Sequence, residues 1–315
     1  MSVALTVVLP TRDPDPGRLS RTLAGLAAQT FPLDQWELLV VDNGSEHAWA
    51  LPDGFAPASR RLSEPKVGLT PARICGIRAA QGDVLVFVDD DNVLAPDYLA
   101  AAVRLFTAYP RLGAAGGPVL PEWESPPPEW ALEFQGLLAL RDLGPASRIC
   151  EGGPGAHWPD FAPVGAGLVV RRTGAIAYAE ALSRDPLRQT LDRTGRMLSS
   201  GGDNDLVFSV LHGGGDVGYF PELRLTHLIP AVRLQPGYLA RLNAGIMRTW
   251  VIVLRIHGQC PWPAIQPWTV PFRCARAWAR TRAWRSPAHR VRWKGRCGQF
   301  RGQAMLQRLA ASTFK

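Results

Sequence analysis

The sequence has no long hydrophobic run and no regular cysteine spacing. A helix that crosses a bilayer needs about 20 mostly apolar residues, but the most apolar stretch, residues 246–256, is interrupted by Arg248 and Arg255. We therefore do not expect a multi-pass membrane protein. The five cysteines include no Cys-x-x-Cys pair, so the sequence indicates neither a zinc site nor a disulfide framework but free thiols in a reducing cytosol.

Acidic residues are missing from the last part of the chain. All 27 Asp and Glu lie at or before Glu222, whereas residues 231–315 hold 14 Arg and 2 Lys, a formal net charge of +16. The first 230 residues carry a net charge of −8, which leaves +8 for the whole chain. Two parts of opposite charge suggest two functions, and we expect one domain at 1–230 followed by a basic, mainly helical region at 231–315.

Apolar runs alternate with helical patterns along the first part of the chain. In order, strands and helices are predicted at residues 5–9, 18–29, 37–41, 71–80, 83–88 and 96–109. A strand at 165–171, a helix at 205–212 and a strand at 225–229 follow. Because the early strands are almost entirely apolar, we expect an α/β fold with a mostly parallel sheet and helices on both faces.

Acidic side chains follow two of the predicted strands. The carboxylates of Asp89–Asp91 repel one another unless a cation lies among them. Mg²⁺ and Mn²⁺ prefer carboxylate oxygens and often bridge to phosphates, so this position predicts metal or nucleotide binding, the alternative being a solvated acidic turn. Asp42 ends the neighbouring strand, where it can accept a hydrogen bond from a base or a sugar hydroxyl, or close an Asx turn before Asn43 and Gly44.

Seven segments form an ordered set: LTVVLPTRD (5–13), LLVVDNGS (38–45), GLTPARICGI (68–77), DVLVFVDDDN (83–92), VGAGLVVRR (164–172), GGDNDL (201–206) and HLIP (227–230). Together they resemble a family 2 inverting glycosyltransferase with the GT-A fold, over about residues 3–245. The resemblance implies a Rossmann-like GT-A sheet in which residues 1–92 bind the nucleotide-sugar and residues 93–230 form the acceptor side.

The resemblance also implies a role for each matching position. It assigns donor binding to Pro10, Thr11, Arg12, Asp42, Arg73, Asp89 and Asp90. Asp91 and His227 would hold Mn²⁺ or Mg²⁺, and Asp203 would be the general base. Candidate residues for the acceptor are Trp130, Trp158, Gly165 and Asp205.

Several of these assignments have a simpler alternative. Asp203 or Ser200 could cap the helix that follows. His227 could be a strand-end histidine bonded to the backbone, and the indoles of Trp130 and Trp158 could pack under loops rather than against a sugar. One position departs from the family pattern, because Gly202 stands where a Glu is expected.

The basic region contains one clear amphipathic helix and one less regular segment. From Leu239 to Ile256 apolar residues recur every three or four positions, with an Arg every seven. Residues 262–300 mix Trp with Arg, which suits the boundary between water and an anionic bilayer, although a solvated surface or a partner interface is also open. A helical wheel over 272–285 is imperfect because Arg282 and Arg285 fall near Trp278. No nucleic-acid-binding module accompanies the charge, so we expect no nucleic-acid partner.

The sequence therefore predicts a metal-dependent inverting glycosyltransferase. It would transfer a sugar from a nucleoside diphosphate, most simply UDP, to a saccharide or lipid-linked acceptor, in polysaccharide or glycoconjugate synthesis, in the cytoplasm and peripherally at the inner face of the membrane. One alternative is a transferase-like protein that binds a glycan or a partner without turnover, which Gly202 favours. A sugar-1-phosphate nucleotidyltransferase is disfavoured, because PTRDPDPG (10–17) stands where a glycine-rich, basic loop would hold triphosphate.

Overall fold

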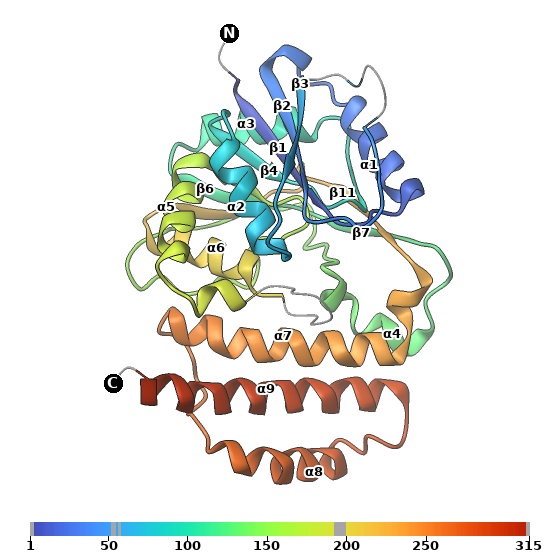
Figure 1. Cartoon of the computed structure of the whole chain (residues 1–315), viewed down its shortest axis with the longest axis vertical. Helices are drawn as coiled ribbons and strands as arrows, with labels where there is room; N and C mark the ends of the chain where they lie inside the picture. The colour runs from blue at the N-terminus through green and yellow to red at the C-terminus, as the bar shows by residue number, and fades with distance from the viewer. Residues whose placement is uncertain (1–2, 52–54, 56–57, 192–199, 313–315) are drawn as a thin grey trace. The chain divides into compact units, whose positions relative to one another are not determined.

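The computed structural model describes residues 3–51, 55, 58–191 and 200–312 (Figure 1). Its contacts divide it into two compact units. Unit 1 comprises Met1–Glu122, Ala139–Gln189 and Leu206–Ile229, and unit 2 comprises Trp123–Leu138, Thr190–Asp205 and Pro230–Lys315. Across the described ranges, no helix is both long enough and apolar enough to cross a membrane.

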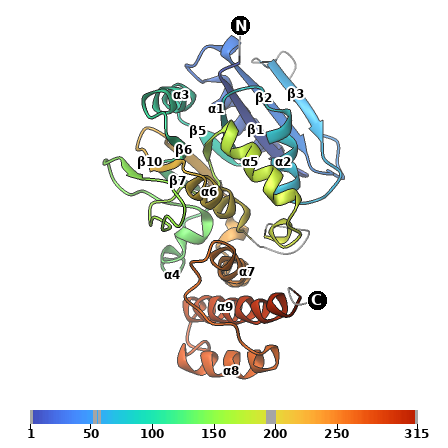
Figure 2. The same ribbon diagram turned by 90° about the vertical axis from the view of Figure 1, so that its left-hand side faces the viewer.

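Unit 1 is built on an eight-stranded mixed sheet with the order β3-β2-β1-β4-β9-β6-β10-β8 (Figures 1 and 2). Its strands are β1 (Leu5–Thr11), β2 (Trp36–Asp42), β3 (Ala58–Ser63), β4 (Val84–Phe87), β6 (Leu112–Gly116), β8 (Arg148–Cys150), β9 (Val169–Arg171) and β10 (Asp216–Tyr219). Strands β3, β2, β1 and β4 are parallel, as are β6 and β10, whereas β9 runs antiparallel between β4 and β6 and β8 runs antiparallel to β10. The expected α/β fold with a mostly parallel sheet is confirmed.

A second, three-stranded sheet brings a late strand beside the end of β4. Its order is β5-β11-β7, with β5 (Asn92–Leu94), β11 (Leu225–Ile229) and β7 (Val119–Trp123). Strands β5 and β11 are antiparallel, and His227 lies opposite Asn92 in the register. This pairing joins two motifs that are more than a hundred residues apart in the sequence.

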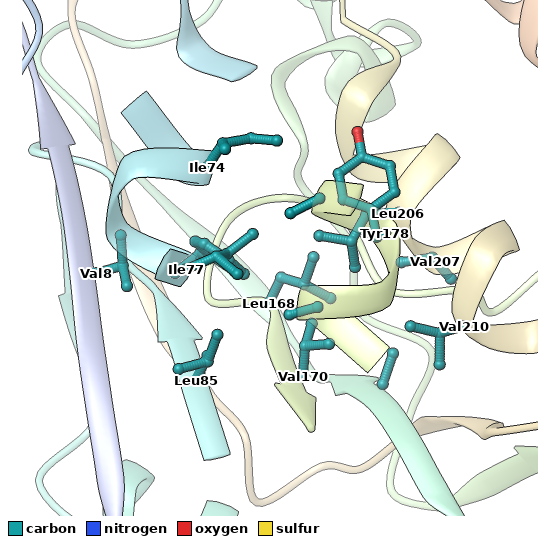
Figure 3. Close-up of a cluster of buried hydrophobic side chains, with 14 of the residues drawn as sticks. Val8, Ile74, Ile77, Leu85, Leu168, Val170, Tyr178, Leu206, Val207 and Val210 are labelled. Atoms are coloured by element: carbon teal, nitrogen blue, oxygen red, sulfur yellow. The ribbon is translucent and has the colours of Figure 1, made fainter. Parts of the chain in front are cut away.

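The helices that accompany these strands are α1 (Pro16–Ala27), α2 (Leu69–Ala79), α3 (Tyr98–Ala108), α5 (Arg172–Ser183) and α6 (Gly202–His212), with the short α4 (Glu129–Leu132) in unit 2. Helices α1, α2, α3 and α6 form where the sequence predicts helices, whereas α5 was not predicted. Helix α2 packs on β1 and β2, and α5 packs on α2 and β9. At Gly76 of α2 an added Cβ would lie 2.3 Å from Cγ1 of Val8, so the helix approaches β1 more closely than any larger residue allows. Figure 3 shows the buried core cluster between these elements.

Unit 2 carries the basic region as three helices, α7 (Pro236–Ile256), α8 (Val270–Arg280) and α9 (Pro287–Ser312). Helix α9 packs against both α7 and α8 and lies between them (Figure 1). The approach of α9 to α7 is close at Gly298, where an added Cβ would lie 2.2 Å from the carbonyl oxygen of Ala244. The expected helical C-terminal region is confirmed.

Candidate functional site

The carboxyl ends of β1 and β2 place Thr11 opposite Asp42 in the sheet register. Asp42 Oδ1 accepts a hydrogen bond from the backbone N–H of Ser45 at 3.1 Å, and its Oδ2 accepts one from Arg61 of β3. Partial burial raises the pKa of Asp42, but the hydrogen bonds from Ser45 and Arg61 outweigh it, so the pKa lies below the ordinary value. Asp42 is thus an ionised, oriented carboxylate at the sheet edge, with an Asx-turn bond as the sequence allowed.

Asn43 fixes the loop that leads into α2, a role that sequence reasoning missed. Its buried amide donates to the carbonyls of Glu64 and Lys66 at 3.0 and 2.9 Å, and its Oδ1 accepts from the N–H of Gly68 at 2.6 Å. A buried side-chain amide that makes three hydrogen bonds to backbone groups holds the loop in one conformation. Only the Asn-Gly pair hinted at it, and that pair predicted a local turn.

The acidic run after β4 forms a tight turn, because the N–H of Asn92 donates to the carbonyl of Asp89 at 3.0 Å. Arg73 of α2 is buried, and its Nη2 lies 3.9 Å from Oδ1 of Asp89. The Thr11 hydroxyl donates to Oδ2 of Asp90 at 2.5 Å. The structure therefore gathers residues from β1, α2 and the β4 turn that the sequence had assigned to one donor site.

Asp91 and His227 meet across the junction of the two sheets. Nε2 of His227 lies 3.4 Å from Oδ1 of Asp91, and both side chains are buried. The N–H of Leu228 donates to the Asp91 carbonyl at 2.9 Å, and the Asn92 amide donates to Oδ1 of Asp91 at 3.0 Å. The pairing of β5 with β11 thus fixes both side chains.

This pair fits two coordination positions of a divalent cation. Donor atoms about 2.1 Å from one ion and at right angles to each other are about 3 Å apart, close to the 3.4 Å between Asp91 Oδ1 and His227 Nε2. Within the part of the chain that the structure describes, no three His, Cys, Asp or Glu side chains gather into a complete metal site. Magnesium and manganese sites that act on phosphates commonly use one or two protein ligands and take the rest from substrate and water.

Other predicted residues of unit 1 lie around this strand edge or in the core. Pro10 is buried within β1, and Arg12 beyond it donates to Glu46 at 3.2 Å. Gly165 is buried in the turn before β9, which starts at Val169 rather than at the predicted residue 165 because this turn contains a positive φ at Gly167. The Trp158 ring centroid lies 4.3 Å from that of Phe208, and Trp158 packs against the core, so its arrangement agrees with the packing alternative.

Three of the predicted residues, Asp203, Asp205 and Trp130, lie in unit 2. Helix α6 begins at Gly202, so Asp203 lies in the first helical turn and does not precede the helix as a cap would. The N–H of Asn204 donates to Oδ1 of Asp203 at 2.9 Å. A carboxylate in the first turn is stabilised as an anion by the helix dipole. The Trp130 ring is tilted against that of Phe134, with centroids 6.4 Å apart.

Asp205 is fully buried and bonded to a histidine that sequence reasoning had assigned no role. Nε2 of His257, the residue after α7, lies 2.8 Å from Oδ1 of Asp205, and its side chain is also buried. Beside it, the Thr249 hydroxyl donates to the Ser200 carbonyl at 3.2 Å. Helix α7 therefore supports the first turn of α6 at two points of unit 2.

Replacing His257 with Ala is expected to lower the free energy of unfolding by about 2 to 4 kcal/mol, since a buried carboxylate loses a hydrogen bond. Urea denaturation measures the loss, and His157→Ala, at an exposed position, is the matched control. A double-mutant cycle with Asp205→Ala isolates the pair. Additive effects of the two substitutions would show that the bond contributes nothing.

Comparisons with known proteins identify a family and several relatives. Residues 6–158 match the family described as Glycosyl transferase family 2. A glucosyl-dolichyl phosphate glucuronosyltransferase of Haloferax volcanii is 30% identical over 130 residues, which cover 40% of this chain and 41% of that protein. The succinoglycan biosynthesis protein ExoM of Rhizobium meliloti is 26% identical over 255 residues, which cover 76% of this chain and 73% of that protein.

An N-acetylglucosaminyltransferase of Sinorhizobium fredii is 35% identical over 121 residues, and the chain spans 29% of that protein's length. The chain thus spans less than half of the glucuronosyltransferase and of the N-acetylglucosaminyltransferase. The solved structure of S. aureus TarS 1-349 is similar at 11% identity and a TM-score of 0.49, covering 98% of this chain and 92% of that one. Residues 6–158, which overlap four of the ordered motifs, therefore belong to glycosyl transferase family 2, a GT-A family.

Proposed function

We propose that this chain is a metal-dependent, inverting glycosyltransferase that moves a sugar from a nucleoside diphosphate, UDP, to a hydroxyl group of a saccharide or lipid-linked acceptor. One observation carries the proposal. The buried Asp91–His227 pair and the Asp89–Arg73 pair are both formed by the acidic turn at the carboxyl end of β4. Ligand sites of open α/β sheets lie at such strand ends. Relatives named for glycosyl transfer and for succinoglycan biosynthesis support the saccharide chemistry.

The residues proposed to bind the donor include positive charge that can balance a diphosphate. The buried guanidinium of Arg73, 5.5 Å above the Phe87 ring, supplies a fixed positive charge. Asp91 and His227 would hold Mn²⁺ or Mg²⁺, and the ion when bound neutralises the charge that develops on the leaving diphosphate. Asp89 and Asp90, the latter oriented by Thr11, would accept from the ribose hydroxyls, and Asp42 with Pro10–Arg12 would contact the base.

Inversion needs one base on the face of the sugar opposite the leaving group. Asp203 is the proposed base, since its position in the first turn of α6 favours the ionised form that accepts a proton from the acceptor hydroxyl. Gly165, Trp130 and Trp158 remain proposed acceptor residues. The second candidate is a glycan-binding protein without turnover. It rests on Gly202, which stands where the family pattern has a Glu.

A thermal-shift screen of nucleoside diphosphates with and without Mn²⁺ tests the proposal. UDP with Mn²⁺, at about 100 times its Kd, should raise Tm by roughly 3 to 6 °C because a ligand that binds only the folded state stabilises it by about 2.7 kcal/mol. ADP, GDP and CDP are the matched controls, and EDTA should cancel the shift. If no diphosphate shifts Tm, or if the UDP shift survives EDTA unchanged, the metal-dependent donor site is wrong.

A further inference from the structure

Helix α8 has one face packed and one face open. Cys274 and Ala277 turn toward α9, and the indole N–H of Trp293 in α9 donates to the Cys274 carbonyl at 2.9 Å. Residues 270, 274, 277 and 281, spaced by three or four positions, form the less exposed stripe. The helix is thereby fixed to α9 by one side, and its opposite side needs a separate explanation.

The open side of α8 is apolar. Trp268, in the short 3-10 helix Pro267–Thr269 that leads into α8, and Phe272 of α8 are 70% and 71% exposed, and their ring centroids are 6.4 Å apart. Ala275 and Ala279 continue the same line at the next turns and are exposed as well. Two neighbouring large aromatic side chains with this much exposure are unusual for a protein surface and indicate a binding face.

Cationic side chains flank this apolar line. Arg273, Arg276 and Arg280 are all exposed and lie beside it on α8, at spacings of three and four residues. No Asp or Glu follows Glu222 in the sequence, so the segment itself has no acidic residue to neutralise them. The surface therefore combines apolar and positive groups, with a single sign of charge.

A second aromatic pair extends the surface beyond the helix. Helix α8 ends at Arg280, and Arg282 adopts a positive φ of 50°, which turns the chain back. Trp284 then packs against Trp278 in a tilted arrangement with ring centroids 4.6 Å apart, and the two residues are 58% and 43% exposed. A helical wheel over residues 272–285 looks irregular because it treats them as one helix, whereas Arg282 and Arg285 lie after the end of α8.

We propose that α8, the short 3-10 helix before it and the turn after it form an interfacial membrane anchor that binds the surface of an anionic bilayer. Trp268, Phe272, Trp278 and Trp284 would enter the boundary between headgroups and acyl chains, while Arg273, Arg276 and Arg280 bind lipid phosphates. The eleven residues of α8 are about 16 Å long, too short to cross a bilayer but suited to lie in its plane.

Charge favours this occupant over a second copy of the chain. Two copies that met through α8 would bring Arg rows of the same sign together with no acidic partner in either segment. An anionic bilayer matches both properties of the surface, because it offers phosphate to the guanidinium groups and an apolar layer to the rings. Nucleic acid would match the charge, and it is therefore one arm of the test.

Vesicle co-sedimentation of the full chain tests the anchor. Wild-type protein should bind vesicles made from an equal mixture of phosphatidylglycerol and phosphatidylcholine. It should not bind vesicles of pure phosphatidylcholine. Trp268→Ser/Phe272→Ser should reduce the partition coefficient by about tenfold or more, since both rings leave the interface. Arg273→Gln/Arg276→Gln/Arg280→Gln should reduce it similarly at low salt and abolish its salt dependence.

The matched control is Leu33→Ser/Leu120→Ser, which removes two exposed apolar side chains from unit 1 and should leave vesicle binding unchanged. Thermal unfolding should be the same for all variants, because the substituted side chains are exposed. Wild-type protein that ignores the anionic vesicles, or that loses binding with the Arg variant but keeps it with the aromatic variant, would overturn the anchor. Tighter binding to single-stranded DNA than to the vesicles, lost in both variants, would assign the surface to nucleic acid instead.

Discussion

Asp203→Asn is expected to lower the rate of sugar transfer by about 10² to 10⁴-fold while leaving donor binding unchanged. The amide has the size of the carboxylate but cannot accept the proton of the acceptor hydroxyl, and a positioned general base contributes on that order. In the structure, Asp203 is partly exposed in the first turn of α6 and is bonded to the N–H of Asn204 at 2.9 Å, which an amide oxygen can also accept. The substitution should therefore change the chemistry without changing the helix start.

The measurement is release of UDP from a panel of UDP-sugars, with water or added saccharide as the acceptor, alongside the calorimetric affinity for UDP and Mn²⁺. Asp34→Asn, an exposed aspartate in the short helix Leu33–Gln35, is the matched control and should behave as wild type. Equal rates in Asp203→Asn and wild type would remove Asp203 from the mechanism. Wild-type protein that binds UDP with Mn²⁺ but turns over no donor would favour the binding protein that Gly202 suggests.

Periodicity in the sequence predicts the core of the fold well. Strands β1, β2 and β4 are fully apolar except near their ends, and α2 and α3 follow their strands at the predicted places. Those segments contain the information for their own structure, because burial on both faces of a parallel sheet leaves little choice of side chain. The order of the motifs then indicates the edge at which their polar residues meet.

Strands that lack an apolar pattern were not predicted. Strand β3, with the sequence ASRRLS, is an exposed edge held by ion pairs: Arg60 with Glu37 at 2.9 Å, and Arg61 with Asp42. Strand β6, LGAAG, is fully buried but made of small residues, which have little strand propensity of their own. Both form because neighbouring strands supply partners, which local patterns do not show.

Site residues could be predicted where they belong to a contiguous motif. They could not be predicted where their contacts depend on tertiary packing. Asp89–Asp91 follow one strand, so their place at the sheet edge could be expected, and HLIP supplied His227. His257 had no such context, since it meets Asp205 only because α7 ends beside the start of α6. A lone histidine at a helix end gives no signal in a single sequence, and its bond becomes visible only in the fold.

Asp91→Asn is expected to weaken Mn²⁺-dependent UDP binding by about 10²-fold, or roughly 2.7 kcal/mol. The amide keeps the size of the side chain, so the turn between β4 and β5 should persist, but it supplies no negative charge to the ion. His227→Asn should weaken binding in the same direction, because Nε2 of His227 lies 3.4 Å from Oδ1 of Asp91 and would be the second ligand. UDP affinity in EDTA should be equal in all three proteins.

Two measurements together make this prediction decisive. Calorimetry gives the UDP affinity with and without Mn²⁺, and electron paramagnetic resonance of free Mn²⁺ reports metal binding independently of any turnover. Asp97→Asn is the matched control, since Asp97 is exposed between β5 and α3 and makes no side-chain cap bond to α3. Because Asp91 and His227 are both buried, loss of fold is checked by thermal unfolding of each apo variant. Folded Asp91→Asn protein that binds UDP and Mn²⁺ with wild-type affinity would show that the metal, if used, is held elsewhere.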